Sequence, residues 1–243
     1  INDYKIVSNP AIQSYQRTFT DSLEVLIQNS SPETSNYYAI ETGSDNQKVL
    51  WKKYDKPFYI HNTSAIKAKS VNAFGDESFI VKGSFFKIDG NRSIQLNAQY
   101  DNQYAADGQK ALIDGIKGNN NFKTGVWQGY QGQDVEAIVD LGGIKLISSI
   151  STGFLQDIKS WIWYPDYVEY YVSEDGQSYK KLKRVNTTFS KLEEGAFTTT
   201  FDCNVPVSTR FVKMVAKNFG KCPEWHLGAG GDTWIFIDEI TIN

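Results

Sequence analysis

Val135-Glu136-Ala137-Ile138-Val139-Asp140-Leu141-Gly142 alternates between apolar and polar side chains and ends in glycine. Successive side chains of a β-strand point to opposite faces of a sheet, so this pattern predicts a strand with one buried face that ends in a turn. Residues 144–150 predict the next strand. The segments that follow this pair decide the fold class.

More strand signals follow at regular spacing. Residues 168–176 predict a strand that enters an Asp-Gly turn, and residues 179–185 return after it. Three further segments complete the set, namely 197–201, 209–216 and 234–242. Short strands that no helices separate are typical of a β-sandwich or jelly roll.

The preceding part of the chain shows shorter strand patterns. Alternation is clear in residues 23–27 and 66–69, and polar turns such as Gly43–Asn46 separate further candidate strands. These candidates cover residues 37–40, 49–54 and 58–60. The pattern predicts a small β-sandwich that ends near Ile88. We therefore expect an all-β chain with two domains, residues 1–91 and 92–243.

Composition excludes several classes of function. A net charge of −3 gives no field that would hold nucleic acid, and no run of about 18 apolar residues could span a bilayer. Cys203 and Cys222 could form a disulfide or remain free thiols, and neither lies in a CxxC pair that would indicate zinc or redox chemistry. Because the chain starts at Ile1 without a signal-like segment, we expect a mature product or a piece of a longer protein.

Five motifs in the second part resemble one known fold. They are Ala111-Leu112-Ile113-Asp114-Gly115, Val139-Asp140-Leu141-Gly142, Tyr171-Val172-Ser173-Glu174-Asp175-Gly176, Thr209-Arg210-Phe211-Val212-Lys213 and Asp238-Glu239-Ile240. Together they resemble the coagulation factor 5/8 type C fold, also called discoidin-like, to which carbohydrate-binding module family 32 belongs. The resemblance implies a discoidin-like β-sandwich or jelly roll for residues 92–243.

A narrower resemblance involves the aromatic motifs. Residues 127–132, 160–165 and 223–226, with 234–236, resemble the C-terminal region of bacterial family 20 β-N-acetylhexosaminidases. The first part fits the same picture, because segments of residues 15–88 resemble the immunoglobulin-like domain that follows the catalytic domain in chitobiase-type hexosaminidases. These segments are Tyr38-Ala39-Ile40, Tyr54-Asp55-Lys56-Pro57-Phe58-Tyr59-Ile60 and Thr63-Ser64-Ala65-Ile66-Lys67-Ala68-Lys69. The resemblance implies an immunoglobulin-like sandwich followed by the discoidin-like domain.

The last loop combines glycine with aromatic residues. Residues 222–234 contain Pro223 and three glycines within four positions, which interrupt regular structure. The loop also carries Trp225 and His226. A flat indole suits the apolar face of a sugar ring, and an imidazole can hydrogen-bond a hydroxyl group. The alternative is a histidine that only ties the loop to a backbone carbonyl.

Two other aromatic groups are candidates for the same surface. Trp161 and Trp163 lie two positions apart, so they would share one face of a strand. They either bind a sugar or pack into a core or against another domain. Trp127, Gln128 and Tyr130 offer aromatic surface and an amide for sugar hydroxyls, although Trp127 suits a core equally well.

Two carboxylates carry the calcium prediction, which comes from the resemblance. Modules of this fold hold a structural calcium through carbonyls, an aspartate near an Asp-Gly pair and a glutamate on the last strand, and Asp114 and Glu239 occupy those positions. Thr124 would be a third ligand, although the loop of residues 116–124 is longer than is usual in the family. Calcium needs hard oxygen ligands. The alternative is a carboxylate that hydrogen-bonds loop amides.

No catalytic motif is apparent. Asp238 and Glu239 are adjacent, and consecutive strand residues point to opposite faces, so they are not expected to flank one glycosidic bond. The sequence contains no Gly-x-Ser-x-Gly elbow, no His-Glu-x-x-His and no Walker loop. We therefore expect a chain that binds rather than catalyses.

The expected function is that of a non-catalytic, carbohydrate-binding C-terminal region of a glycoside hydrolase, by resemblance a β-N-acetylhexosaminidase. Its expected partners are a glycan, such as one containing N-acetylhexosamine or galactose, and the catalytic domain of the parent protein. The expected location is periplasmic, cell-surface or secreted. Two rival functions remain open: an accessory domain that completes or supports the catalytic site, and a structural spacer.

Overall fold

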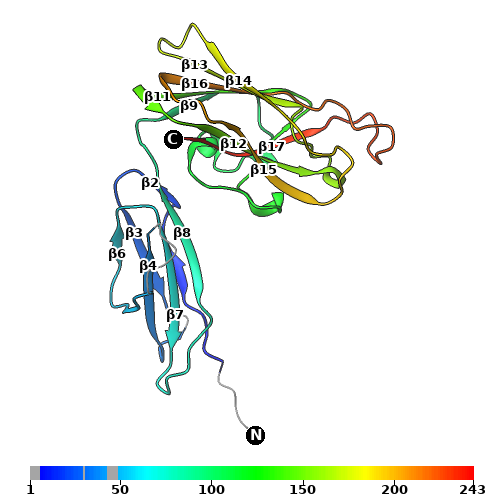
Figure 1. Cartoon of the computed structure of the whole chain (residues 1–243). Helices are drawn as coiled ribbons and strands as arrows, with labels where there is room; N and C mark the ends of the chain where they lie inside the picture. The colour runs from blue at the N-terminus through cyan, green and yellow to red at the C-terminus, as the bar shows by residue number, and fades with distance from the viewer. Residues whose placement is uncertain (1–5, 30, 43–48) are drawn as a thin grey trace. The chain divides into compact units, whose positions relative to one another are not determined.

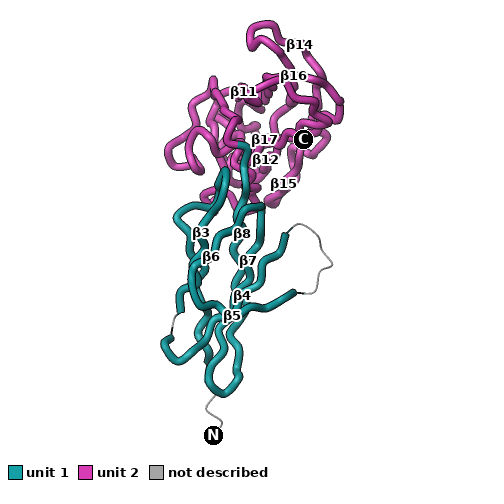
Figure 2. Tube along the Cα trace, turned by 90° about the vertical axis from the view of Figure 1, so that its left-hand side faces the viewer, with its two compact units in different colours: residues 1–89 teal, residues 90–243 magenta. Residues whose placement is uncertain are grey.

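The computed structural model describes residues 6–29, 31–42 and 49–243. The chain divides into two compact units, residues 1–89 and 90–243 (Figure 2). The all-β prediction is confirmed, since the helices of the described residues are short 3-10 turns. The turn expected at Gly43–Asn46 lies outside the described residues.

Unit 1 is a β-sandwich. Its strands are β1 (Ala11–Gln13), β2 (Thr18–Phe19), β3 (Leu23–Gln28), β4 (Ser35–Glu41), β5 (Lys52–Lys53), β6 (Phe58–Ile60), β7 (Ser64–Val71) and β8 (Val81–Lys87). One sheet has the order β1-β3-β6 and the other the order β2-β8-β7-β4-β5. Leu23 and Val25 of β3 meet Ile66 of β7 in a common core. The alternation read from residues 23–27 and 66–69 thus places apolar side chains between the sheets.

Unit 2 is a larger antiparallel sandwich (Figure 1). Its strands are β9 (Ser93–Leu96), β10 (Gln128–Gln131), β11 (Val135–Ile147), β12 (Ile150–Asp157), β13 (Tyr167–Ser173), β14 (Lys180–Asn186), β15 (Ala196–Cys203), β16 (Val207–Ala216) and β17 (Trp234–Ile242). The sheet orders are β10-β17-β12-β15 and β14-β13-β16-β11-β9. Short 3-10 turns lie in the connections: η1 (Asn102–Tyr104), η2 (Gly108–Ile113), η3 (Phe122–Thr124) and η4 (Ile158–Ser160). One large apolar core fills the space between the two sheets.

The turn expected at Gly142 is instead a bulge within β11. This strand pairs with β16 on both sides of an irregularity between Asp140 and Lys145. Gly142 has a φ of +78°, and its N–H donates to Asp140 Oδ1 over 2.8 Å. A glycine adopts that left-handed conformation without steric cost, so the strand bends and continues. The two strands expected from residues 135–150 are therefore one long strand and the start of β12.

The hairpin expected around Asp175 is present. β13 and β14 pair in antiparallel fashion, and Asp175 Oδ1 accepts from the N–H groups of Gln177 and Ser178 over 2.8 and 2.9 Å. Those donors, with the Ser173 hydroxyl, lower the pKa of Asp175 to about 2. Gly176 has a φ of +73°, as the turn requires.

The cysteines are free thiols in separate places. Cys203 is buried in the large core, and Cys222 is buried beside Trp163. Burial raises the pKa of both thiols. Among the described residues, no helix is long and apolar enough to span a membrane.

Several connections meet at one end of unit 2. The chain leaves β12 into η4 at this end, and contacts of Trp163 with Lys191 and Phe219 bring the β14–β15 and β16–β17 connections beside it. The β16–β17 connection, residues 217–233, extends beyond the sheets in Figure 1, at the end of β17 opposite the C-terminus. We call these three connections the loop end.

Candidate functional site

Trp163 is the centre of a small core beneath the loop end. It is 1% exposed and stacks on Phe219 with ring centroids 5.3 Å apart. Its indole N–H donates to the carbonyl of Lys191 over 3.2 Å. Ile158 and Cys222 complete this core. Because one indole joins all three connections, Trp163 holds the loop end together.

Trp161 explains the glycine run of the last loop. A Cβ added at Gly228 or Gly231 would lie closer than 3.0 Å to the Trp161 ring, so only glycine lets the loop backbone lie against the indole. Trp161 itself has a φ of +65° at the end of η4. Residues 161–163 are therefore not a regular strand, and the expected shared strand face is replaced by a 3-10 turn followed by an isolated bridge at Ile162.

His226 fixes the same loop from inside. Its Nδ1 accepts the Gly228 N–H over 3.0 Å, so the proton of the neutral ring sits on Nε2, which lies 2.8 Å from the Ile158 carbonyl and donates to it. Both ring nitrogens are thus occupied within the protein. Neither ring nitrogen of His226 is left to hydrogen-bond a sugar directly. The geometry therefore favours the alternative role, in which His226 ties the loop to a backbone carbonyl.

The structure brings the predicted loop aromatics together. The His226 ring centroid lies 6.4 Å from that of Trp161, 5.1 Å from that of Trp163 and 5.8 Å from that of Trp225. Their exposure differs sharply. Trp225 is 52% exposed, whereas Trp163 is buried. Of this group, Trp225 therefore has the largest face available to a ligand, next to the fully exposed Leu227.

Trp127, Gln128 and Tyr130 lie inside the protein. All three are at most 1% exposed. The Trp127 indole N–H donates to the Asn119 carbonyl over 3.0 Å. The Gln128 amide donates to Gly108 O over 2.6 Å and accepts from the Tyr130 hydroxyl over 2.7 Å. This corrects the expectation of direct sugar contact by these residues, because buried and fully bonded groups offer no surface to a glycan. The burial of Trp163 corrects the same expectation for that residue.

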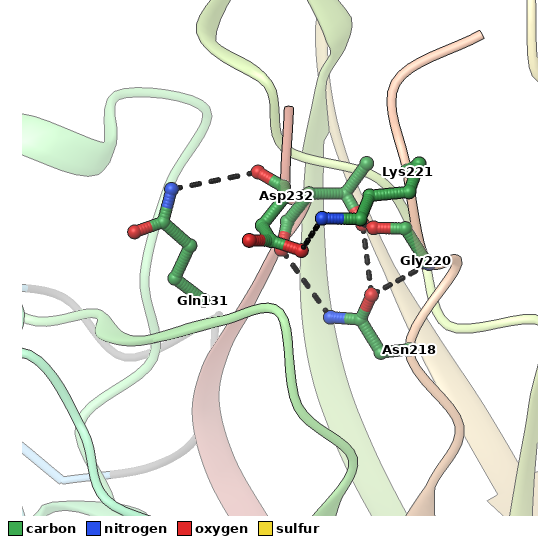
Figure 3. A network of polar contacts seen from close by, with 6 residues as sticks. Gln131, Asn218, Gly220, Lys221 and Asp232 are labelled. Atoms are coloured by element: carbon green, nitrogen blue, oxygen red, sulfur yellow. Dashed lines mark hydrogen bonds and ion pairs between the residues drawn. The ribbon is translucent and has the colours of Figure 1, made fainter. Parts of the chain in front are cut away.

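A polar network fixes the base of the last loop (Figure 3). Asn218 Oδ1 accepts from Gly220 N over 2.6 Å and from the Thr233 hydroxyl over 2.8 Å. Lys221 Nζ lies 2.6 Å from Asp232 Oδ1, and the Gln131 amide reaches Asp232 O over 3.5 Å. Both ends of the loop are thus anchored to each other and to β10. The sequence pattern gave no signal for Asn218 or Asp232, because their partners are distant along the chain.

The proposed metal ligands Asp114 and Glu239 lie in one buried polar region. The Gly115 N–H donates to Glu239 Oε2 over 3.0 Å, and the Ile116 N–H donates to Asp114 Oδ1 over 2.7 Å. Burial, with the negative charges of Asp114 and Asp238, raises the pKa of Glu239 to about 9. Thr124 is exposed, and its hydroxyl donates to Asn121 O over 3.0 Å.

This donor set fits a hard cation in part. Burial and the charges of Asp114 and Asp238 disfavour the ionised form of Glu239, and a bound cation would favour that form. Within the described residues, no cluster of three or more His, Cys, Asp or Glu side chains has metal-ligand geometry. A calcium ion here would therefore need backbone carbonyls as well as Asp114 and Glu239.

Asp238 and Glu239 do not point to opposite faces. The pairing of β12 with β17 shifts register between Thr152 and Phe154, so two residues of β17 face the single Gly153 of β12. In this bulge both carboxyl groups line the same hollow. The expectation based on simple strand alternation is corrected for these two residues.

Unit 2 is thus an antiparallel β-sandwich of two sheets with several connections gathered at one end. The sequence profile of the F5/8 type C domain family matches residues 91–235, and the chain belongs to this family. The resemblance read from the five motifs is thereby confirmed, whereas the narrower resemblance to family 20 hydrolases remains a prediction. No curated protein gives a significant match to the chain.

Solved structures with similarity to the chain include three bacterial modules. CpGH89CBM32-5 from Clostridium perfringens, in complex with GalNAc-β-1,3-galactose, is 19% identical and covers 63% of this chain and 95% of its own, with a TM-score of 0.41. CBM32-3 from a family 31 glycoside hydrolase of the same organism is 12% identical, with coverages of 63% and 90% and a TM-score of 0.40. Chitosan-binding module 1 from a chitosanase/glucanase of Paenibacillus sp. IK-5 is 13% identical, with coverages of 63% and 95% and a TM-score of 0.38.

Proposed function

We propose that unit 2 is a carbohydrate-binding module that recognises a glycan at the loop end, with Trp225 as its aromatic anchor. The observation that carries the proposal is the half-exposed indole of Trp225 on a loop held rigid from below. An aromatic ring that is already positioned loses little conformational freedom when it stacks on a sugar. Membership of the F5/8 type C family, which includes carbohydrate-binding modules, supports the same function.

Three sets of contacts support this loop. Trp161 lies against Gly228 and Gly231, His226 bonds backbone on both sides, and the Asn218 network closes the loop at its base. Scaffolds that fix a loop in this way commonly carry binding residues at its tip. In this proposal Trp161, Trp163 and His226 position the site, and Trp225 contacts the glycan.

A glycan array tests this function. The chain should retain a defined set of glycans, and Trp225→Ala should lose them while its circular dichroism spectrum is unchanged. Phe79→Ala is the matched control, because Phe79 is an exposed aromatic residue of unit 1. Equal binding by the wild type and Trp225→Ala, or no binding by any of the three proteins, would contradict the proposal.

One observation favours a second candidate function. Leu227 is fully exposed beside Trp225, and an aliphatic side chain suits a protein surface better than a sugar ring. In that case the loop would contact the catalytic domain of the parent protein and complete or support its site. This candidate predicts no glycan binding by the chain alone, but reduced activity of the parent enzyme when Trp225 and Leu227 are changed.

We further propose a structural calcium held by Asp114, Glu239 and nearby carbonyl oxygens, as the family resemblance implies. The ion would neutralise carboxyl groups that otherwise repel one another. Thr124 is not part of this proposal, because it is exposed whereas Asp114 and Glu239 are buried. The ion would stabilise the fold rather than take part in chemistry.

The parent protein in this proposal is a glycoside hydrolase of the β-N-acetylhexosaminidase type, located in the periplasm, at the cell surface or outside the cell. Unit 1 would be its immunoglobulin-like domain. The support for these finer statements is the resemblance of residues 15–88 and of the aromatic motifs. A binding module linked to an enzyme raises the substrate concentration near the catalytic site. A purely structural spacer would not raise that concentration.

A further inference from the structure

A second hollow lies on the outer face of the four-stranded sheet and shares no lining residue with the loop end. Its volume is about 350 Å³, and strands β12, β15 and β17 supply most of its wall. Ser151 pairs with Thr241 on one side and with Asp202 on the other. These side chains alternate along their strands with the core residues Ile150 and Ile242, so they point away from the core.

The wall of this hollow is rich in hydroxyl groups. Of the lining residues, Ser151, Thr198, Thr200 and Thr241 carry hydroxyl groups on this face of the sheet. Two of them already donate to Asp202, Ser151 over 2.6 Å and Thr200 over 3.2 Å, so their oxygens are left to accept. Within the described part of the chain, the hydroxyls of Thr198 and Thr241 have no hydrogen-bond partner. They can both donate to a ligand and accept from it.

Asp238 supplies a fixed acceptor in the hollow. It is 5% exposed, and its carboxyl oxygens accept from Gly118 N over 2.8 Å and from Glu239 N over 2.6 Å. A Cβ at Gly153 would lie closer than 3.0 Å to Asp238 Oδ1, so the glycine makes room for this carboxyl group. Each carboxyl oxygen has two lone pairs, and each can accept a second hydrogen bond from a ligand hydroxyl.

The hollow presents several kinds of hydrogen-bonding group. Lys117 is exposed at its edge, and Asp238 and Glu239 lie in its wall, so an ammonium group, hydroxyl groups and carboxyl oxygens all face a ligand. Most of the lining residues are polar, and the aromatic residue among them, Phe154, is buried. The volume is at the lower end of the range of about 300–1,000 Å³ that is typical of small-ligand pockets. A small molecule with many hydroxyl groups matches these features.

We propose that this hollow is a second carbohydrate site, which binds one neutral sugar residue through Thr198, Thr241 and Asp238. It does not depend on Trp225, and so it extends the proposed function to a separate surface of the same unit. A module with two such sites could hold two residues of a branched glycan, or two chains, and would gain avidity from them.

Nuclear magnetic resonance with the full ¹⁵N-labelled chain tests the proposal. The probes are N-acetylglucosamine, galactose and glucose, each to about 50 mM, which detects a Kd in the millimolar range. We expect at least one sugar to shift the amide signals of Gly118, Ser151, Thr200 and Thr241. Thr198→Val with Thr241→Val should raise the Kd about tenfold or more, because it removes two hydroxyl groups and keeps the side-chain shape.

Two variants serve as controls. Thr20→Val changes an exposed threonine of unit 1 and should leave the Kd unchanged. Trp225→Ala should abolish only shifts at the loop end, so failure of the loop site and failure of the hollow give different results. The proposal is overturned if no sugar shifts the hollow signals, if the double valine variant binds as wild type does, or if calcium shifts these signals while sugars do not.

Discussion

Replacing Trp163 with alanine tests the role of the buried indole. Trp163 is 1% exposed, stacks on Phe219 and bonds the Lys191 carbonyl. Truncation of a buried tryptophan typically costs about 3–5 kcal/mol, and 1 kcal/mol lowers Tm by about 2–4 °C in a domain of this size. Trp163→Ala should therefore lower the melting temperature of unit 2 by about 6–20 °C.

Trp225→Ala is the matched comparison for this measurement. Half of the Trp225 side chain already faces solvent, so its truncation should cost less than half as much stability. Thermal unfolding followed by circular dichroism gives both values. If Trp163→Ala melted like the wild type, or if Trp225→Ala were the less stable of the two, the division between supporting and ligand-facing tryptophans would be refuted.

Three further changes probe other parts of the account. Gly228→Ala should lower stability by about 1–3 kcal/mol, because the added Cβ would overlap Trp161. Gly143→Ala is the control and should melt like the wild type, since the space around Gly143 is open. Equal melting temperatures of the two variants would contradict the packing described for the loop. Burial opposes the ionised form of Glu169, but hydrogen bonds from Lys181, Tyr171 and Arg184 outweigh burial and lower the pKa of Glu169 to about 2. The stability that this group contributes is therefore present above pH 4.5 and is lost as the pH falls toward 2. In an acid titration, Glu169→Gln should not show that loss. Metal-free unit 2 should lose stability as the pH rises from 4.5 through about 9, because Glu239 keeps a proton in the folded state that it releases in the unfolded chain. Calcium should remove this loss. Identical curves of stability against pH with calcium and with chelator would argue against the ion.

The strands were predictable because their signal is local. Alternation in residues 23–27 and 135–141 needs only the two-residue period of a strand and one buried face. The bulge at Gly142 was not predictable, since it depends on β16 pairing with both halves of β11. The same reason explains the carboxyl groups of Asp238 and Glu239, whose common orientation depends on Gly153 in a neighbouring strand.

The site was predictable only as a region. Residues 161–163 and 225–226 do meet in the structure, as the aromatic motifs indicated. However, an indole that fills a core and an indole that faces solvent look alike in a sequence. Trp127 and Trp163 proved to be buried, whereas Trp225 is half exposed. His226 finds its partner at Ile158, 68 residues away, so its supporting role could not be read from its neighbours.

Isothermal titration of the purified chain with a glycan chosen from the array tests the central claim most directly. The account predicts saturable binding by the wild type and a loss of at least about tenfold in affinity for Trp225→Ala, since an aromatic anchor of this kind is typically worth 1.4 kcal/mol or more. The melting temperatures of the two proteins should agree to within a few degrees, which corresponds to a difference of about 1–2 kcal/mol in the free energy of unfolding. Undiminished binding by a folded Trp225→Ala chain would contradict the claim that this exposed indole anchors the glycan.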